Sequence, residues 1–178
     1  LSELVQSLDE PDLQTIEDAV EMIDESLDGA RRVSDIVKGL RELSRLEIGR
    51  REPADTNSSV TRVVRTEFGD QPPHVSLVLE AAVPADIAPL QLDQALGHLV
   101  KNARQATPQK QHIVVRTWST DDEVMIQVRD EGVGIAKEHL RRVFEPFFTT
   151  RGVGKGIGLG LTAAYGIVRR AGGDIEAE

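Results

Sequence analysis

The segment from Asp130 to Leu161, DEGVGIAKEHLRRVFEPFFTTRGVGKGIGLGL, is the part of the chain from which the fold is inferred. It holds seven of the 15 glycines and three of the four phenylalanines, all between Gly132 and Gly160. Glycine weakens the interior of helices and strands, so such a local concentration indicates loops with a functional role. We therefore expect a binding site here.

The segment begins where an alternating apolar run ends. This run predicts a buried strand that ends at Asp130, and it consists of Val124, Ile126 and Val128. A carboxylate at a strand end can accept a hydrogen bond from the adenine amine and would repel the O6 acceptor of guanine. Gly132 and Gly134 allow a sharp turn beside a ring, and Ile135 offers it an apolar face. Alone, this pattern is more typical of an ordinary strand-to-loop turn.

A second glycine run, from Gly154 to Gly160, leads directly into an apolar helical segment. The helical positions are Leu161, Ala164, Ile167 and Val168. Backbone N–H groups at a helix N-terminus form a site for phosphate oxygens. The same run is also compatible with a flexible linker or a helix cap.

One more element lies upstream, between Leu92 and Ala106. Apolar residues at 92, 95, 96, 99, 100, 103 and 106 define the buried face of a helix. His98 and Asn102 are four residues apart and share another face. An Asn amide oxygen is a suitable ligand for Mg²⁺ that is also held by nucleotide phosphates, although a helical Asn is often only hydrogen-bonded or solvated.

Together these motifs resemble the ATP-binding domain of sensor histidine kinases of two-component systems. Asn102 is similar to their N box, 130–135 to the G1 box, 144–151 to the F box and 154–161 to the G2 box, in the family's order. The resemblance implies a Bergerat (GHKL-type) domain, which is an α/β sandwich with helices on one face of a mixed sheet. It also implies ATP and Mg²⁺ as cofactors.

The resemblance further implies individual roles. Asn102 would hold Mg²⁺, Asp130 would bind the adenine amine, and Gly156, Gly158 and Gly160 would bind phosphates. The whole expected nucleotide site is Asn102, Asp130, Gly132, Gly134, Ile135, Phe148, Thr149, Thr150, Arg151, Lys155, Gly156, Gly158, Leu159, Gly160 and Leu161.

Several side chains of the 144–155 segment have two possible roles. Arg151 and Lys155 either neutralise β/γ-phosphate charge or are solvated. Thr149 and Thr150 either donate hydroxyl hydrogen bonds or shape the turn. We expect the three phenylalanines, Phe144, Phe147 and Phe148, to pack the base of this segment against the domain and to couple nucleotide occupancy to its order.

A long periodic stretch from about residue 12 to residue 50 predicts one helix of a helical bundle. Its apolar positions are Ile16, Val20, Ile23, Leu27, Ala30, Val33, Val37, Leu40, Leu43 and Leu46. It resembles the second helix of the dimerisation and histidine-phosphotransfer hairpin, which implies a homodimeric four-helix bundle. Residues 1–8 resemble the end of a preceding helix.

The phosphoacceptor His of that hairpin has no counterpart here. His74, His112 and His139 are expected to be surface residues in a loop, at a strand start and in a helical turn. We therefore expect the chain to begin just after the acceptor and to be clipped at its C-terminus. The predicted α+β organisation is a partial hairpin over 1–52, followed by the catalytic domain over 53–178.

The remaining elements follow from local signals. Pro53 ends the long helix, and Asp55 or Thr56 caps a helix that runs to about Phe68. Strands are predicted over 75–80, 112–118 and 124–130, the last two as an antiparallel hairpin, and a strand is expected to begin at 174. A short helix is predicted over 137–144, and Gly172-Gly173 ends the last helix.

Composition restricts the partners. The net charge of −9 argues against nucleic acid, and the absence of cysteine among 178 residues fits a reducing compartment. The sequence contains no apolar run that would span a bilayer, so we expect a cytoplasmic domain that meets a membrane only through segments not present here.

The position of His98 bears on the reaction. Gyrase-type ATPases place a Glu one turn before the metal Asn to activate water, whereas chemotaxis kinases resemble this chain in having His. We therefore expect phosphoryl transfer to a His and then to an Asp of a response-regulator receiver domain. His98 is either an orienting or proton-accepting group in this reaction, or it only forms a hydrogen bond with a neighbouring residue. Alternatives are an anti-sigma-type Ser/Thr kinase, which the bundle helix disfavours, and a non-catalytic nucleotide-binding module.

Overall fold

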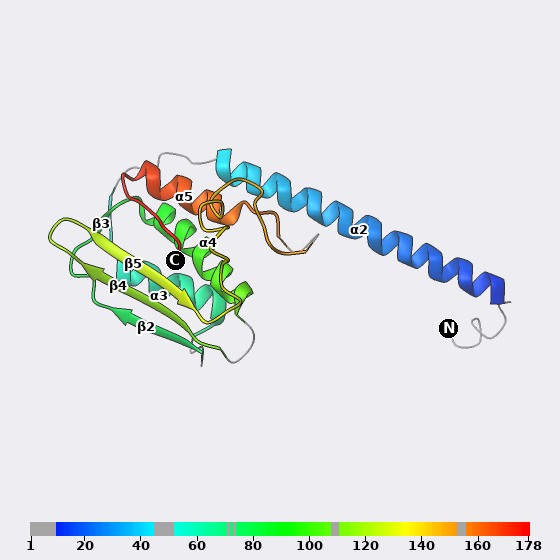
Figure 1. Cartoon of the computed structure of the whole chain (residues 1–178), viewed down its shortest axis with the longest axis horizontal. Helices are drawn as coiled ribbons and strands as arrows, with labels where there is room; N and C mark the ends of the chain where they lie inside the picture. The colour runs from blue at the N-terminus through cyan, green and yellow to red at the C-terminus, as the bar shows by residue number, and fades with distance from the viewer. Residues whose placement is uncertain (1–9, 45–51, 71, 73, 108–110, 153–155) are drawn as a thin grey trace.

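The computed structural model describes residues 10–44, 52–70, 72, 74–107, 111–152 and 156–178. A long helix projects from a domain in which helices cover one face of a sheet (Figure 1). The elements in chain order are α2 (Glu10–Ser44), β1 (Pro53–Ala54), α3 (Thr56–Phe68), β2 (Val75–Leu79), β3 (Ala85–Asp86), α4 (Pro89–Ala106), β4 (Ile113–Ser119), β5 (Val124–Asp130) and α5 (Gly160–Arg170). The predicted α+β fold class is confirmed.

The long helix α2 has the apolar stripe that its sequence predicts, and much of that stripe faces solvent. Ile16, Val20, Ile23 and Leu27 are all exposed. The helix contacts α5 near its C-terminal end. The predicted continuation to residue 50 and the short helical piece over 1–8 lie outside the described residues.

The main sheet is mixed and has the order β2-β4-β5. Strand β2 runs parallel to β4, with Val75 opposite Ile113, whereas β5 runs antiparallel to β4 and places Asp130 opposite Ile113. The hairpin from β4 to β5 was predicted and is confirmed, because its strands alternate apolar and polar residues on either side of a polar turn. It delivers Asp130 to an end of the sheet.

Three helices form the layer over the sheet, with α4 in the middle. Helix α4 contacts α3 on one side, α5 on the other and β5 beneath it. Its buried residues recur at helical spacing, which is why this face is covered. The core contains Val60, Val63, Val64, Ile87, Leu92, Ala95, Leu96, Val100, Ala103, Ile113, Val115, Ala164 and Ile167.

Polar groups fix the start of α3. The carboxylate of Asp55 accepts hydrogen bonds from the backbone N–H and the hydroxyl of Ser58, at 3.0 and 2.8 Å, so Asp55 is the N-cap that the sequence predicted. In the first turn of α3, Asn57 Oδ1 accepts a hydrogen bond of 2.6 Å from the hydroxyl of Thr117 on β4. This bond joins α3 to the middle strand.

Two local expectations were wrong, and one short element was not expected. Residues 137–144 form successive turns instead of a helix. The His139 carbonyl accepts from Arg142 N–H, three residues on, and from Val143 N–H, four residues on, so three-residue and four-residue bonds are mixed. Residues 174–178 form no strand; they have no strand neighbour in the described structure, and Ile175 packs against the core. The short antiparallel pair β1–β3 was not predicted, since each strand has only two residues.

Candidate nucleotide-binding site

The loop after β5 is seated on the C-terminal end of α4. Gly132 N–H donates to Asp130 Oδ1 at 2.9 Å, and Val133 N–H donates to the carbonyl of Ala106 at 3.2 Å. A Cβ at residue 132 would lie 2.4 Å from that carbonyl oxygen, so only glycine allows the loop to approach so closely. The half-buried Asp130 carboxylate retains acceptor capacity, because it can accept about four hydrogen bonds.

Two apolar side chains of this loop face solvent. Val133 is 85% exposed and Ile135 is 39% exposed, although the residues of β5 just before them alternate into the core. Apolar side chains beside a half-buried carboxylate provide both the contact surface and the polar group that a flat heterocycle requires.

A backbone hydrogen bond joins Phe147 to Gly158. Phe147 N–H donates to the carbonyl of Gly158 at 3.0 Å, and both residues have left-handed backbone, with φ of 65° and 71°. A Cβ at residue 158 would lie 2.4 Å from the carbonyl oxygen of Phe148. A strained non-glycine residue such as Phe147 persists only where its surroundings fix it.

The phenylalanines do not act as one cluster. Phe144 packs against Tyr165 of α5, with ring centroids 5.4 Å apart, and Phe148 packs against His139 at 5.3 Å. Phe147 is 57% exposed, so the expectation that all three pack against the domain was wrong for this one. His139 is half-buried by its contact with Phe148 and is not the surface residue we expected, whereas His74 and His112 are exposed.

The N-terminus of α5 meets α4 at His98. A Cβ at Gly160, the first residue of α5, would lie 3.5 Å from His98 Nδ1. Among the described residues, no side chain caps this helix start at Leu159. Backbone N–H groups of the first turn have no partner within the helix, and together with the helix dipole they favour an anion.

Arg151 lies against the face of α4 that carries Asn102. One guanidinium nitrogen, Nη2, donates to Asn102 Oδ1 at 2.9 Å and approaches the backbone carbonyl of the same residue at 3.5 Å. The other, Nη1, donates to Gln105 Oε1. The backbone N–H of Arg151 donates to Thr149 Oγ1 at 3.1 Å, so Thr149 shapes this turn.

These contacts bring the predicted motifs together on one helix. His98, Asn102 and Ala106 are spaced by four residues and therefore share one face of α4. His98 lies beside the start of α5, Asn102 binds Arg151, and Ala106 binds the loop of Gly132. The structure thus joins the four predicted motifs along one helix face. Gly154 and Lys155 lie outside the described residues.

Sequence reasoning missed Gln105 and the carbonyl of Ala106. Gln105 lies three residues after Asn102, and this spacing on a predicted helix could have placed its side chain beside that of Asn102. The Ala106 carbonyl gives no signal in the sequence, because every residue has one.

A metal at this site would depend on the nucleotide. The described residues contain no group of three or more His, Cys, Asp or Glu side chains that could hold a metal ion. The single amide oxygen of Asn102 fits Mg²⁺ held mainly by phosphates and water, which is the usual arrangement for this ion.

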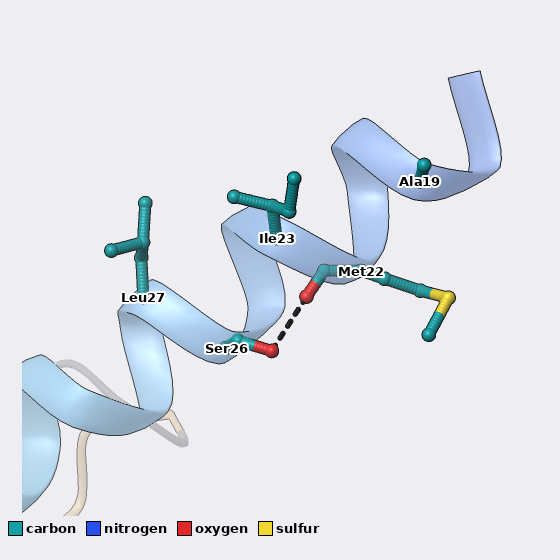
Figure 2. Close-up of a pocket in the computed structure, with 5 residues that line it drawn as sticks. All are labelled: Ala19, Met22, Ile23, Ser26 and Leu27. Atoms are coloured by element: carbon teal, nitrogen blue, oxygen red, sulfur yellow. Dashed lines mark hydrogen bonds between the residues drawn. The ribbon is translucent and has the colours of Figure 1, made fainter. Parts of the chain in front are cut away.

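A hollow lies away from this site, on one side of α2 (Figure 2). It is lined by Ala19, Met22, Ile23, Ser26 and Leu27, with the Ser26 hydroxyl bonded to the Met22 carbonyl. All five come from a single exposed helix, so the hollow is open and has no convergent polar groups. We interpret it as part of the apolar stripe and not as a ligand pocket.

Residues 87–178 match the family described as "Histidine kinase-, DNA gyrase B-, and HSP90-like ATPase". The chain belongs to this family. The Sensor kinase CckA of Brucella abortus is 40% identical over 108 residues, which are 52% of this chain and 11% of that protein. The Signal transduction histidine-protein kinase AfsQ2 of Streptomyces coelicolor is 30% identical over 172 residues, 92% of this chain and 30% of that protein.

The fold is also that of solved histidine kinases. The Acinetobacter baumannii histidine kinase AdeS superposes with a TM-score of 0.60 and 26% identity, covering 88% of this chain and 79% of that chain. The predicted GHKL-type ATP-binding domain of a sensor histidine kinase is therefore confirmed. The chain spans 11% and 30% of the two curated relatives named above. None of its described helices has the length and apolarity that crossing a bilayer requires.

Proposed function

We propose that this chain binds Mg-ATP and serves a protein-histidine kinase of a two-component system. The observation that carries the proposal is the single face of α4, on which His98, Asn102 and Ala106 meet the start of α5, Arg151 and the loop of Gly132. Base, metal and phosphate groups of one nucleotide would be bound along this face, in that family's order.

The base would lie at the end of β5. Asp130 would accept a hydrogen bond from the adenine amine through lone pairs that Gly132 does not use. Gly134 would provide the turn, and Ile135 would cover the ring. Guanine presents an oxygen acceptor at the same place, so the carboxylate would exclude it.

The phosphates would lie between the start of α5 and the segment that precedes it. N–H groups near Gly158 and Gly160, which begin the helix, would bind phosphate oxygens. The proposed set in this region also includes Phe148, Thr149, Thr150, Arg151, Lys155, Gly156, Leu159 and Leu161.

Asn102 would hold Mg²⁺ through its amide oxygen. The ion would supply charge neutralisation of the phosphates when bound. His98 lies close to the first residue of α5 and would orient the γ-phosphoryl group or accept a proton from the attacking side. The phosphoacceptor His is not among the residues of the sequence that match the family's motif, so transfer would be to a His outside this chain and then to an Asp of a receiver domain.

The exposed stripe of α2 supports a homodimer. Large apolar side chains on one exposed helix face are costly in water, and a partner helix would cover them. The partition into 1–52 and 53–178, the helical bundle and a cytoplasmic location belong to this proposal.

Calorimetry tests the nucleotide site directly. We expect the chain to bind a non-hydrolysable ATP analogue with Mg²⁺, and Asp130→Asn to weaken binding at least about tenfold and to reduce discrimination against the guanine analogue. Asp121→Asn, a change of the same kind in the exposed hairpin turn, should bind like wild type. Failure of the wild-type chain to bind any adenine nucleotide would remove the proposal.

The catalytic role of His98 needs the complete protein. Autophosphorylation should fall in His98→Ala while nucleotide affinity changes little, because the proposed role concerns the transferred group. An unchanged rate would leave His98 as a packing residue beside Gly160. Nucleotide binding without any phosphoryl transfer by the complete protein would instead indicate a non-catalytic module.

A further inference from the structure

The amide oxygen of Asn102, which is proposed to hold Mg²⁺, accepts a hydrogen bond from Arg151. Arg151 Nη2 donates to Asn102 Oδ1 at 2.9 Å, while Nη1 of the same guanidinium donates to Gln105. The two acceptors are one turn apart on α4, and the planar guanidinium spans them with its two arms. Lysine can reproduce only part of this contact, since its compact ammonium lacks the planar fork of the guanidinium.

We propose that Arg151 is a positioning residue that ties residues 149–152 to α4 in the free protein and leaves Asn102 when Mg-nucleotide binds. The first half of this statement depends only on the contacts of Arg151. The second half, its release, rests on the proposed function, because it requires the metal at Asn102.

The geometry makes Arg151 the attachment point of its segment. Thr149 Oγ1 accepts from the backbone N–H of Arg151, which fixes the turn from which the guanidinium extends. On the N-terminal side, the backbone N–H of Phe147 donates to the carbonyl of Gly158. Thr149, Thr150 and Gly152 are exposed, so Arg151 is the residue of 149–152 that is half-buried against the domain.

Charge explains why the contact must change. An amide oxygen that accepts from a guanidinium and also binds Mg²⁺ would bring two cations close together in a half-buried position. The nucleotide offers the guanidinium an alternative partner in its phosphates, with which bidentate pairing is strong. Binding therefore exchanges one arginine contact for another and frees the segment to rearrange.

The absence of cysteine from the sequence allows a direct test with two introduced labels. Lys101→Cys is exposed on α4, and Gly152→Cys has open space around its Cβ. Spin labels at these sites report the distance between the segment and the helix. Without nucleotide, we expect a narrow distance distribution that becomes broad in Arg151→Ala and in Asn102→Ala and intermediate in Arg151→Lys.

Two controls isolate the contact. Arg129→Ala removes an exposed arginine from β5 and should leave the distribution narrow. A second label pair, Lys101→Cys with Gln127→Cys, joins α4 to β5 and should not respond to Arg151→Ala, which excludes general unfolding. A distribution in Arg151→Ala that matches wild type would overturn the attachment.

Release is tested by adding a non-hydrolysable ATP analogue to the labelled wild type. With Mg²⁺ we expect the narrow distribution to shift or broaden, and with EDTA we expect the change to be several-fold smaller, because the metal competes for Asn102. Equal changes in both conditions, or none when calorimetry shows binding, would overturn the release. Absence of binding in calorimetry would instead contradict the proposed function and leave the attachment standing.

Discussion

Gly39 of α2 lies directly against Leu159, which immediately precedes the first residue of α5. A Cβ built at residue 39 would be 2.7 Å from Leu159 Cδ1, which is closer than atoms in contact allow. Leu159 is itself buried and stands between Gly158, which closes the preceding segment, and Gly160, which meets His98. The long helix therefore touches the ATP-binding domain at the start of α5.

Replacing Gly39 by alanine should loosen this contact. Alanine favours a helix by about 0.5–1 kcal/mol over glycine, but at residue 39 its methyl group would force Leu159 to move. Gly29 is the matched control, because nothing lies within 4 Å of its Cβ position in the same helix. In hydrogen exchange, we expect Gly39→Ala to speed exchange in the first turn of α5 and Gly29→Ala to leave it unchanged. Equal behaviour of the two variants would contradict a close contact.

Gly158→Ala should weaken the backbone hydrogen bond between Phe147 and Gly158. The new methyl group would approach the Phe148 carbonyl at 2.4 Å, and an L-residue in the left-handed region costs about 1–2 kcal/mol in addition. The loss of order is measured by exchange of the Phe147 amide and by nucleotide affinity. Gly152→Ala enters open space and should change neither, so a similar response from both variants would argue against a role for this hydrogen bond.

The hydroxyl of Thr117 should contribute to stability through its bond to Asn57. Thr117 is fully buried, and its oxygen also accepts from the backbone N–H groups of Glu80 and Ala81 at 3.2 and 3.3 Å. Thr117→Val removes the partner of Asn57 Oδ1 and of the Ala81 N–H, whereas the Glu80 N–H keeps its bond to the Thr117 carbonyl. We expect this loss to cost about 1–3 kcal/mol in the free energy of unfolding.

Thr117→Ser is the matched variant for this prediction. It keeps the hydroxyl and loses only a methyl group, which is worth about 1 kcal/mol. Urea unfolding at neutral pH distinguishes the two. A larger loss for serine than for valine would indicate that packing, and not hydrogen bonding, is the main role of this residue.

Acid should weaken the start of α3. Hydrogen bonds from the backbone and hydroxyl of Ser58 lower the pKa of Asp55 below its usual value. The unfolded chain, with an Asp pKa of about 3.9, therefore takes up the proton first. The contribution of Asp55 to stability is present above that pH and is lost as pH falls through the lower folded-state pKa.

Asp55→Asn separates this titration from the cap itself. Asparagine retains the capping oxygen but has no charge to lose, so the part of the pH dependence below about pH 4 that belongs to this residue should disappear. Urea midpoints at pH 7 and pH 3 are the measurement. The cap assignment would be undermined if Asp55→Ala were as stable as wild type at pH 7.

The sequence by itself determined most of the local structure and the order of the motifs. The helical period from Leu92 to Ala106, the Asp55 cap and the alternation that ends at Asp130 depend on residues close together in the chain, and all three are present in the structure. The family could be inferred for the same reason, because its motifs are short and their chemistry is local.

Only the tertiary structure decided which distant residues meet. From the sequence alone, Arg151 could equally have been solvated, yet in the structure it binds Asn102, 49 residues away. The turns over 137–144 likewise replace a predicted helix, and they bury Val143 while Phe148 packs against His139 of the same turns. Gly39 faces Leu159 for no reason visible in its neighbours. Such contacts depend on how whole elements pack, and no periodicity or cap encodes that arrangement.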